Sequence, residues 1–151
     1  MMRPTTLATS AAVAATALVG SAGTDVTSPW YRRLDKPRWQ PPGAVFGGVW
    51  TALYVLLAVA GSRAVPRGGR GYVRAYAANL ALNAGWTWAF FRAHRPSLAT
   101  VEAAALAVST TDLARRTARL DPVAGRLLLP YAGWTAFAVA LSAEITRRNA
   151  R

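Results

Sequence analysis

Residues 28–54 read SPWYRRLDKPRWQPPGAVFGGVWTALY, and this stretch decides how the chain is expected to fold. A loop rich in aromatic residues, prolines and basic residues leads directly into an apolar segment. No charged residue lies between Arg38 and Arg63, and about 20 such residues are the length that a helix needs to cross a bilayer core. Three amphipathic aromatic residues lie in the loop just before the apolar segment: Trp30, Tyr31 and Trp39. Such rings suit the headgroup level of a bilayer, so the stretch predicts a membrane protein with an aromatic loop over one end.

The composition agrees with a membrane protein. The chain has 151 residues, is 53% hydrophobic and has a net charge of +12, from 18 basic and 6 acidic residues. Such a charge suits either a nucleic-acid binder with a basic patch or a membrane protein whose arginines flank apolar spans. The basic residues lie between and beyond the apolar runs, which favours the second interpretation. We therefore expect membrane lipid, and no nucleic acid, as a partner.

The residue types that usually carry catalysis or hold metals are scarce. The chain has no cysteine, so disulfides and cysteine metal sites are excluded. Its single histidine, His94, stands between Arg92 and Arg95, a setting more typical of an interfacial loop than of a haem or metal ligand. No Ser–His–Asp set and no phosphate-binding glycine loop is evident. We expect no catalytic residue and no metal site.

Five apolar segments predict an all-α membrane protein, a five-helix transmembrane bundle that forms a single domain over residues 1–151. The predicted helices are 7–22, 43–61, 72–91, 97–113 and 123–145. Short connections should make the last four antiparallel neighbours. The long connection, 23–42, is expected to be functional, and Pro130 is expected to kink the last helix.

The first segment has a second interpretation. It follows Arg3 and ends in GSAG at residues 20–23, which resembles a secretory signal peptide cleaved near Ala22. However, the uncharged run 4–24 is long enough to span a bilayer, and four helices alone would lack one wall of a bundle. We expect this segment to remain as the first helix.

Aromatic residues recur at helical spacing in three of the segments. The stripes are Phe46, Trp50 and Tyr54; Tyr76, Asn79 or Leu80, Asn83, Trp86 or Thr87, and Phe90; and Tyr131, Trp134, Ala138 and Ser142. Residues three or four apart share a helix face, so converging stripes would form an apolar pocket with a few polar groups. Plain helix packing would produce the same spacing, and the spacing does not decide between the two. Asn79 and Asn83 should face the bundle interior or a ligand, because an amide in lipid needs a partner.

A different face of the third segment carries only small residues: Ala77, Ala81, Gly85 and Ala89. Small residues at this spacing let helix backbones approach closely in membranes. The stripe could pack on another helix of the same chain or on a second copy. We predict that it forms a homodimer interface.

Motifs rich in tryptophan and proline cover nearly the whole chain in order. They are WY at 30–31, KPRWQPP at 36–42, VFGGVWTALY at 45–54, LALNAGWT at 80–87 with FF at 90–91, and LLPYAGWTAFA at 128–138. Together they resemble the signature of the translocator protein and tryptophan-rich sensory protein family, also called TspO/MBR or the peripheral-type benzodiazepine receptor family. The chain is similar to its bacterial members.

The resemblance implies a five-helix bundle, often dimeric, with a cavity beneath the first loop, in a membrane that for a bacterial member would be the cell membrane. It implies a receptor or sensor that binds tetrapyrroles such as protoporphyrin IX or haem and related hydrophobic ligands, with no obligate cofactor. Light- and oxygen-dependent porphyrin degradation, or transport of lipophilic molecules, are the alternatives. The implied ligand-binding positions are Tyr31, Trp39, Phe46, Trp50, Asn83, Trp86, Phe90, Trp134 and Ala138. Basic loop residues would pair with porphyrin propionates: Arg32, Arg33 and Arg38.

The sequence departs from the family pattern at four positions. The family commonly has Gln at Asn79, Pro at Trp88, Gly at Arg92 and Asn at Ser142. Each change alters hydrogen-bond donors or volume near the expected pocket, so ligand preference is open. The sterol motif of animal members is missing from the last helix, so the sequence does not support sterol binding.

Overall fold

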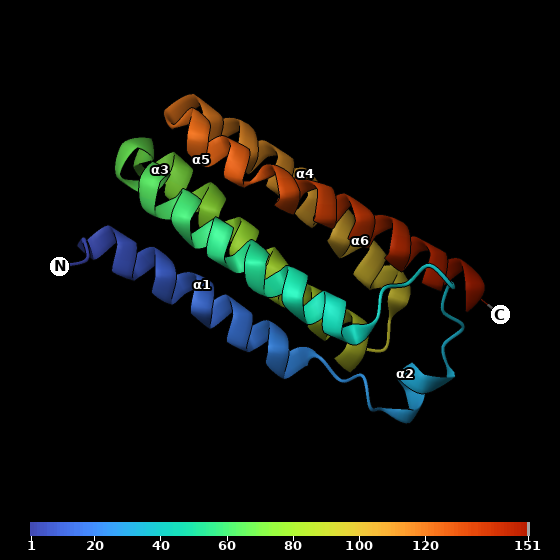
Figure 1. Cartoon of the computed structure of the whole chain (residues 1–151). Coiled ribbons are helices and arrows are strands. Elements are labelled where there is room, and N and C mark those ends of the chain that lie inside the picture. Colours follow the sequence, from blue (N-terminus) through green and yellow to red (C-terminus); the bar gives the residue numbers. More distant parts are fainter. Residues whose placement is uncertain (151) are drawn as a thin grey trace.

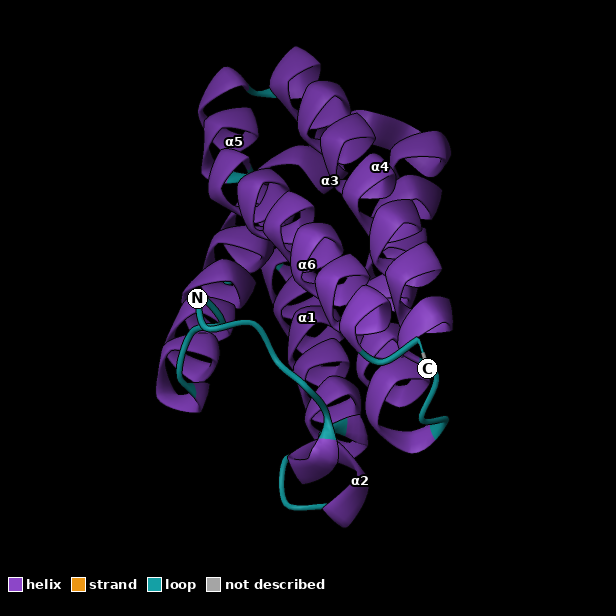
Figure 2. Ribbon diagram, turned by 90° about the vertical axis from the view of Figure 1, so that its right-hand side faces the viewer, coloured by secondary structure: helices purple, strands orange, loops and turns teal. Residues whose placement is uncertain are grey.

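The computed structural model describes residues 1–150, and regular structure in that range is entirely helical (Figures 1 and 2). The elements are α1 (Pro4–Gly23), α2 (Pro29–Arg33), α3 (Gly43–Thr87), the π-helix η1 (Trp88–Arg92), α4 (Pro96–Leu120), α5 (Pro122–Leu127) and α6 (Leu129–Arg148). The predicted all-α fold class is confirmed. The predicted loop 23–42 contains the short helix α2, whose first turn Ser28 caps by accepting a hydrogen bond from the amide of Tyr31.

Helix α3 folds back on itself at Gly69, where φ is +65°. Glycine adopts this region without steric cost. The chain reverses there, so the first arm (43–68) and the second arm (70–87) lie side by side and antiparallel (Figure 1). The Tyr76 hydroxyl donates to the Leu57 carbonyl between them at 2.8 Å. The arms correspond to the predicted second and third helices. The predicted connection 62–71 is mostly helical, and the chain reverses at Gly69.

Two other predicted boundaries also shift. Helix α4 continues well past residue 113, because its later charged residues suit a helix surface: Asp112 and Arg116 pair across one turn at 2.7 Å. The predicted last helix is interrupted at Leu128 and becomes α5 and α6. Pro130 lies in the first turn of α6, where its missing N–H costs little.

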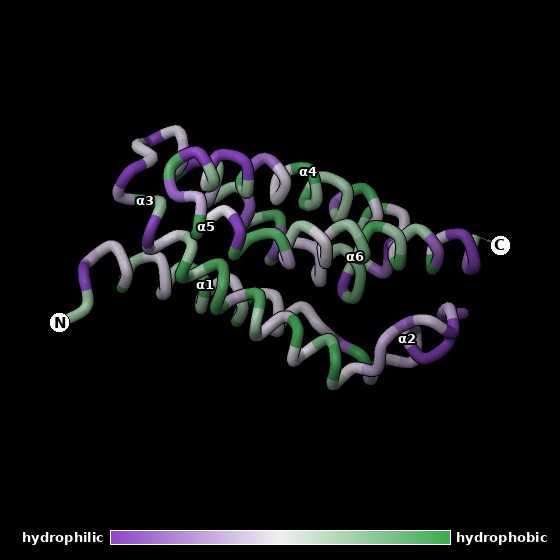
Figure 3. Tube along the Cα trace, turned by 45° about the horizontal axis from the view of Figure 1, so that its top comes forward, coloured by the Kyte–Doolittle hydropathy of each residue, from purple (hydrophilic) through white to green (hydrophobic). Residues whose placement is uncertain are grey.

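The helices pack around one interior. Helix α1 packs on α3, and α4 packs on both α3 and α6, so that the long helices run side by side (Figure 1). Leu57, Leu128 and Tyr131 are fully buried between them. The trace is hydrophilic around α2 and the C-terminal end of α6, and again at the other end of the bundle near the bend of α3 (Figure 3). Polar ends on an apolar bundle are the arrangement expected of a membrane protein.

Three helical stretches are long and apolar enough to cross a membrane: Pro4–Gly23, Gly43–Arg92 with both arms of α3, and Pro122–Arg148. Helix α4 falls outside this class, since Glu102, Asp112 and several arginines lower its hydropathy. Its outer surface still exposes Val101 and Val108, as a helix facing lipid would.

Asp121 joins α4 to α5 and ties both to α3. Its buried carboxylate accepts hydrogen bonds from the amides of Val123 and Ala124, both at 3.0 Å, and from Arg63 Nε at 2.8 Å. The amide of Ala124, followed by the charge of Arg63, holds the pKa of Asp121 below its usual value. The ionised carboxylate therefore stabilises this end of the bundle.

We predict that Asp121→Asn lowers thermal stability at neutral pH and much less in acid. Asparagine keeps the helix cap but loses the charge that faces Arg63. Because the folded pKa is lowered, the stabilisation is present above the ordinary aspartate pKa of about 3.9 and disappears as the pH falls through the folded value. Unfolding temperatures in detergent from neutral pH to about pH 3 would measure this. A difference in unfolding temperature between parent and variant that does not change with pH would contradict the stabilising role of the ionised Asp121 carboxylate.

Candidate functional site

A cavity of about 620 Å³ lies beneath the loop between α1 and α3. Its lining comes from α1, the loop, both arms of α3, η1 and α6. The volume falls within the range of about 300–1,000 Å³ that is typical of small-molecule sites. Among the described residues, no charged side chain lines it.

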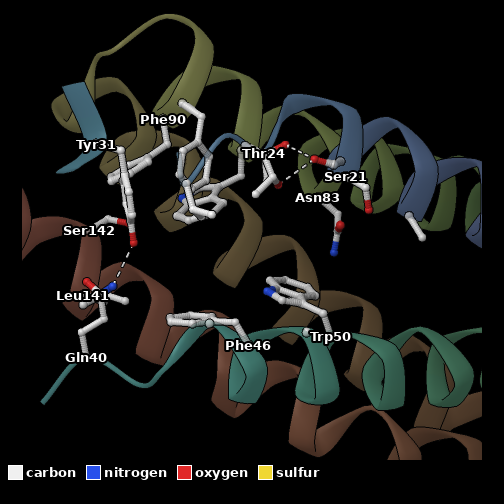
Figure 4. Close-up of a pocket in the computed structure, with 18 of the residues that line it drawn as sticks. Ser21, Thr24, Tyr31, Gln40, Phe46, Trp50, Asn83, Phe90, Leu141 and Ser142 are labelled. Atoms are coloured by element: carbon white, nitrogen blue, oxygen red, sulfur yellow. Dashed lines mark hydrogen bonds between the residues drawn. The ribbon is translucent and has the colours of Figure 1, made fainter. Parts of the chain in front are cut away.

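Aromatic rings form two walls of the cavity. Phe46 and Trp50 lie one turn apart on the first arm of α3, and Tyr31 and Phe90 lie across the cavity from them (Figure 4). Trp86 stacks on Phe90 with ring centroids 5.4 Å apart. Phe90 belongs to η1, whose wider turn is closed by the amide of Ala93 bonding to the Trp88 carbonyl at 2.9 Å. Single π-helical turns of this kind are frequent at functional sites.

The structure brings together six of the nine positions that the resemblance implied. The six that line the cavity are Tyr31, Phe46, Trp50, Asn83, Trp86 and Phe90. Trp39 is 49% exposed, and its ring packs edge-on against Phe137 outside the cavity. Trp134 lies behind the wall, edge-on to Phe46 at 5.5 Å and to Trp50 at 6.4 Å. Ala138, on α6, is not among the lining residues.

One wall has no counterpart among the aromatic stripes. Helix α1 contributes Ala17, Gly20 and Ser21, and the following loop contributes Thr24. These residues are small and neither aromatic nor charged, so the sequence patterns used above did not single them out. Their spacing of three, one and three residues does place them on one helix face, so a search for small-residue stripes could have found them.

Buried polar atoms in the cavity point to a ligand. Three lining side chains each have an atom without a hydrogen-bond partner in the described range: Gln40 Oε1, Trp86 Nε1 and Ser142 Oγ. The other end of the Gln40 amide donates to the Tyr31 hydroxyl at 3.0 Å (Figure 4). A buried polar group without a partner costs about 1–3 kcal/mol, so a ligand that supplies partners would recover that cost.

The side-chain amide of Asn83 forms hydrogen bonds to two tyrosine hydroxyls inside the bundle. Its Oδ1 accepts from the Tyr54 hydroxyl at 2.9 Å, and its Nδ2 donates to the Tyr131 hydroxyl at 2.7 Å. Tyr131 in turn donates to Asn79 Oδ1 at 3.0 Å, and Asn79 Nδ2 donates to the Thr110 hydroxyl at 3.0 Å. Asn79 therefore takes the first of its two predicted roles, as an interior amide that joins helices. Asn83 takes part in this network and also lines the cavity.

Two of the departures from the family pattern hold α1 in place. Trp88 Nε1 donates to the Val19 carbonyl and Arg92 Nη2 to the Ala22 carbonyl, both at 2.9 Å. Thr87 adds a bond from its hydroxyl to the Gly20 carbonyl at 2.7 Å. The Gly20 carbonyl also accepts from the amide of Thr24 at 3.2 Å, so Thr87 adds a further bond there. The Ala22 carbonyl lies in the last turn, where helix carbonyls have no partner within the helix. These contacts, which we call the α1 clamp, position the α1 wall of the cavity.

We predict that Gly23→Ala weakens the α1 clamp. A Cβ atom at Gly23 would lie 2.6 Å from Thr87 Oγ1 and 2.8 Å from the Trp88 ring, so α1 would have to move away. Overpacking of this kind costs about 1–3 kcal/mol, which thermal unfolding in detergent would measure. Gly133→Ala on α6 is the control, because a Cβ there meets nothing within 4 Å. Equal stability of the two variants would mean that α1 does not depend on this contact.

Comparison with known proteins identifies the family. The profile of the TspO/MBR family matches residues 8–148. The chain belongs to the TspO/MBR family. It is 42% identical over 123 residues to the tryptophan-rich sensory protein of Cereibacter sphaeroides, covering 80% of this chain and 77% of the relative.

Other members of the TspO/MBR family are also similar. The translocator protein of Homo sapiens is 36% identical over 129 residues, covering 80% of this chain and 75% of the relative. The tryptophan-rich protein TspO of Chlorobaculum tepidum is 32% identical over 140 residues, with 87% and 89% covered. With its long apolar helices, this TspO/MBR chain is an integral membrane protein, and the matched range includes the whole cavity lining.

Proposed function

We propose that this TspO/MBR protein is a receptor or sensor in a bacterial cell membrane that binds a planar tetrapyrrole, protoporphyrin IX or haem, in the cavity. The observation that carries the proposal is the pair of aromatic walls, with Phe46 and Trp50 facing Tyr31 and Phe90 across uncharged space. A flat apolar ring between such walls gains stacking contacts worth about 0.5–1.5 kcal/mol each beyond burial of its area.

The polar groups of a porphyrin sit at its edge, on the propionates. Trp86 Nε1 and Ser142 Oγ, the buried donors without partners, can each donate to a carboxyl oxygen. The ammonium of Lys36 is engaged within the loop, where it donates to the carbonyls of Tyr31 and Leu34 at 2.7 and 3.1 Å. The loop also presents the three arginines that we expect to pair with propionates: Arg32, Arg33 and Arg38. They are exposed and form no ion pair within residues 1–150, so charge-assisted bonds to propionates are open to them.

Ring contact, rather than iron ligation, is the basis of this binding mode. His94 lies outside the cavity, exposed and stacked on Trp30 with centroids 4.4 Å apart. The hydroxyls of the lining Tyr31 and Tyr54 are engaged with Gln40 and Asn83. We therefore expect iron-free protoporphyrin and haem to bind with similar affinity.

We predict that Trp50→Ala weakens protoporphyrin IX binding by about 1–3 kcal/mol, the scale of a lost buried aromatic contact. Trp134→Ala should also weaken it, since Trp134 supports Phe46 and Trp50 from behind. Titration followed by porphyrin Soret absorbance would measure both, without relying on protein fluorescence that the mutations themselves change. Trp39→Ala is the matched control and should bind like the parent, because Trp39 lies outside the cavity. Parental affinity in both Trp50→Ala and Trp134→Ala would overturn the proposed site.

A second candidate function uses the same cavity. Trp50 and Trp86 both line it, so an excited porphyrin bound there would lie against oxidisable indoles. Light- and oxygen-dependent degradation of the bound porphyrin is therefore the alternative activity. A light-versus-dark absorbance time course on the complex distinguishes it from binding alone. Translocation, which the name of the human relative suggests for that protein, would instead appear as porphyrin flux in liposomes.

We also propose a homodimer built on the small-residue face of the second arm of α3. Ala77 and Ala81 are exposed, whereas Gly85 and Ala89 are partly covered within the chain. A Cβ at Gly85 would lie 3.3 Å from Glu102 Oε1 of α4, so a large residue there would disturb the bundle itself. Ala81 is the better position for a test.

We predict that Ala81→Leu shifts the protein toward monomer, because a bulky side chain prevents close approach of two backbones. Cross-linking or mass photometry in detergent would detect the shift. Ala52→Leu, an exposed substitution on the first arm of α3, should leave the dimer intact. Porphyrin binding should survive in both variants. A dimer that tolerates Ala81→Leu would place the interface on another face.

A further inference from the structure

A second groove lies at the bend of α3, at the opposite end of the bundle from α2 and the cavity loop (Figure 1). It has a volume of about 450 Å³ and is lined by Val65, Pro66, Gly69, Arg70, Val73 and Arg74. None of these residues lines the cavity described above. The groove therefore needs an account of its own.

The shape of the groove follows from the reversal of the chain. The positive φ of Gly69 turns the second arm back alongside the first, which leaves Val65 and Pro66 on one side and Val73 on the other. Val73 is 45% exposed. A Cβ at Gly69 or Gly71 would meet nothing within 4 Å, so the backbone at the bend is open to a ligand. The groove combines an apolar surface with accessible backbone at the end of two membrane-spanning arms.

The charges of the groove have one sign. Arg70 and Arg74 stand four residues apart on one helix face, where like charges repel each other. Neither forms an ion pair within residues 1–150. The acids at this end are engaged elsewhere: Asp121 pairs with Arg63, and Asp112 with Arg116.

The surroundings of the groove are also basic. Further arginines belong to this end of the bundle: Arg3, Arg63, Arg67, Arg115, Arg116, Arg119 and Arg126. Asp112 and Asp121 are the acids at this end of the bundle, so the arginines outnumber them and this end carries a strong positive charge. An anion held between Arg70 and Arg74 would relieve their repulsion.

We propose that this groove binds the headgroup of an anionic phospholipid. Arg70 and Arg74 hold the phosphate by charge-assisted hydrogen bonds, and Val65, Pro66 and Val73 contact the glycerol and the upper acyl chain. The apolar contacts and the position at the end of two spanning helices favour a lipid over a free phosphate ion. Basic pockets at membrane-facing helix ends recognise such headgroups. The proposal does not depend on tetrapyrrole binding.

The test uses the purified full-length protein in mixed micelles that contain either phosphatidylglycerol or phosphatidylcholine. Native mass spectrometry counts the lipid that each protein retains, and thermal unfolding reports the accompanying stabilisation. The parent should retain phosphatidylglycerol several-fold better than phosphatidylcholine. Arg70→Gln with Arg74→Gln should abolish that preference, and the unfolding temperature in phosphatidylcholine alone should stay parental, which shows that the variant is folded.

The matched control is Arg115→Gln with Arg119→Gln, which removes the same charge from exposed positions on α4 at the same end, outside the groove. It should keep the lipid preference. Equal loss in both double variants would mean a diffuse surface charge effect and would overturn the site, as would an unchanged preference in the groove variant. Displacement of phosphatidylglycerol by an equal concentration of inorganic phosphate would show that the groove recognises a phosphate ion, not a lipid.

Discussion

The hydroxyl of Tyr131 is the point at which the helices of the bundle are joined. It is fully buried, accepts from Asn83 and donates to Asn79. Asn83 also accepts from Tyr54 on the first arm of α3, and Asn79 also donates to Thr110 on α4. A bundle in lipid has no water to satisfy such groups, so each must find its partner inside. The network therefore holds both arms of α3, α4 and α6 in one arrangement, and the cavity depends on that arrangement.

The polar groups of the interior divide into two sets. The side chains of the Tyr131 network bond mainly to one another within the chain. Gln40, Trp86 and Ser142 instead keep buried atoms without partners, and all three line the cavity. The first set stabilises the bundle, whereas the second is suited to recognising a ligand. This division explains how one interior can be both a stable core and a binding site.

Helix α1 stands outside the Tyr131 network, and the α1 clamp replaces that connection. Trp88 and Arg92 bond to carbonyls near its C-terminal end, and Gly23 permits the close approach. The helix supplies Ala17, Gly20 and Ser21 to the cavity lining, so its position affects the shape of the site. The groove at the bend of α3 shares no lining residue with the cavity, and the two surfaces can serve different ligands.

The sequence by itself determined the all-α membrane fold, the family and the helix faces that carry aromatic rings, because these follow from apolar runs, local spacing and ordered tryptophan–proline motifs. Only the tertiary structure decided which rings reach the cavity. Trp134 and Trp50 have equally regular spacing, yet Trp134 lies behind the wall, since depth depends on how each helix is rotated against its neighbours. The hydrogen bonds from Trp88 and Arg92 to α1 could not be predicted from the sequence either. Their partners are backbone carbonyls about 70 residues away, and every residue has a backbone carbonyl whatever its type.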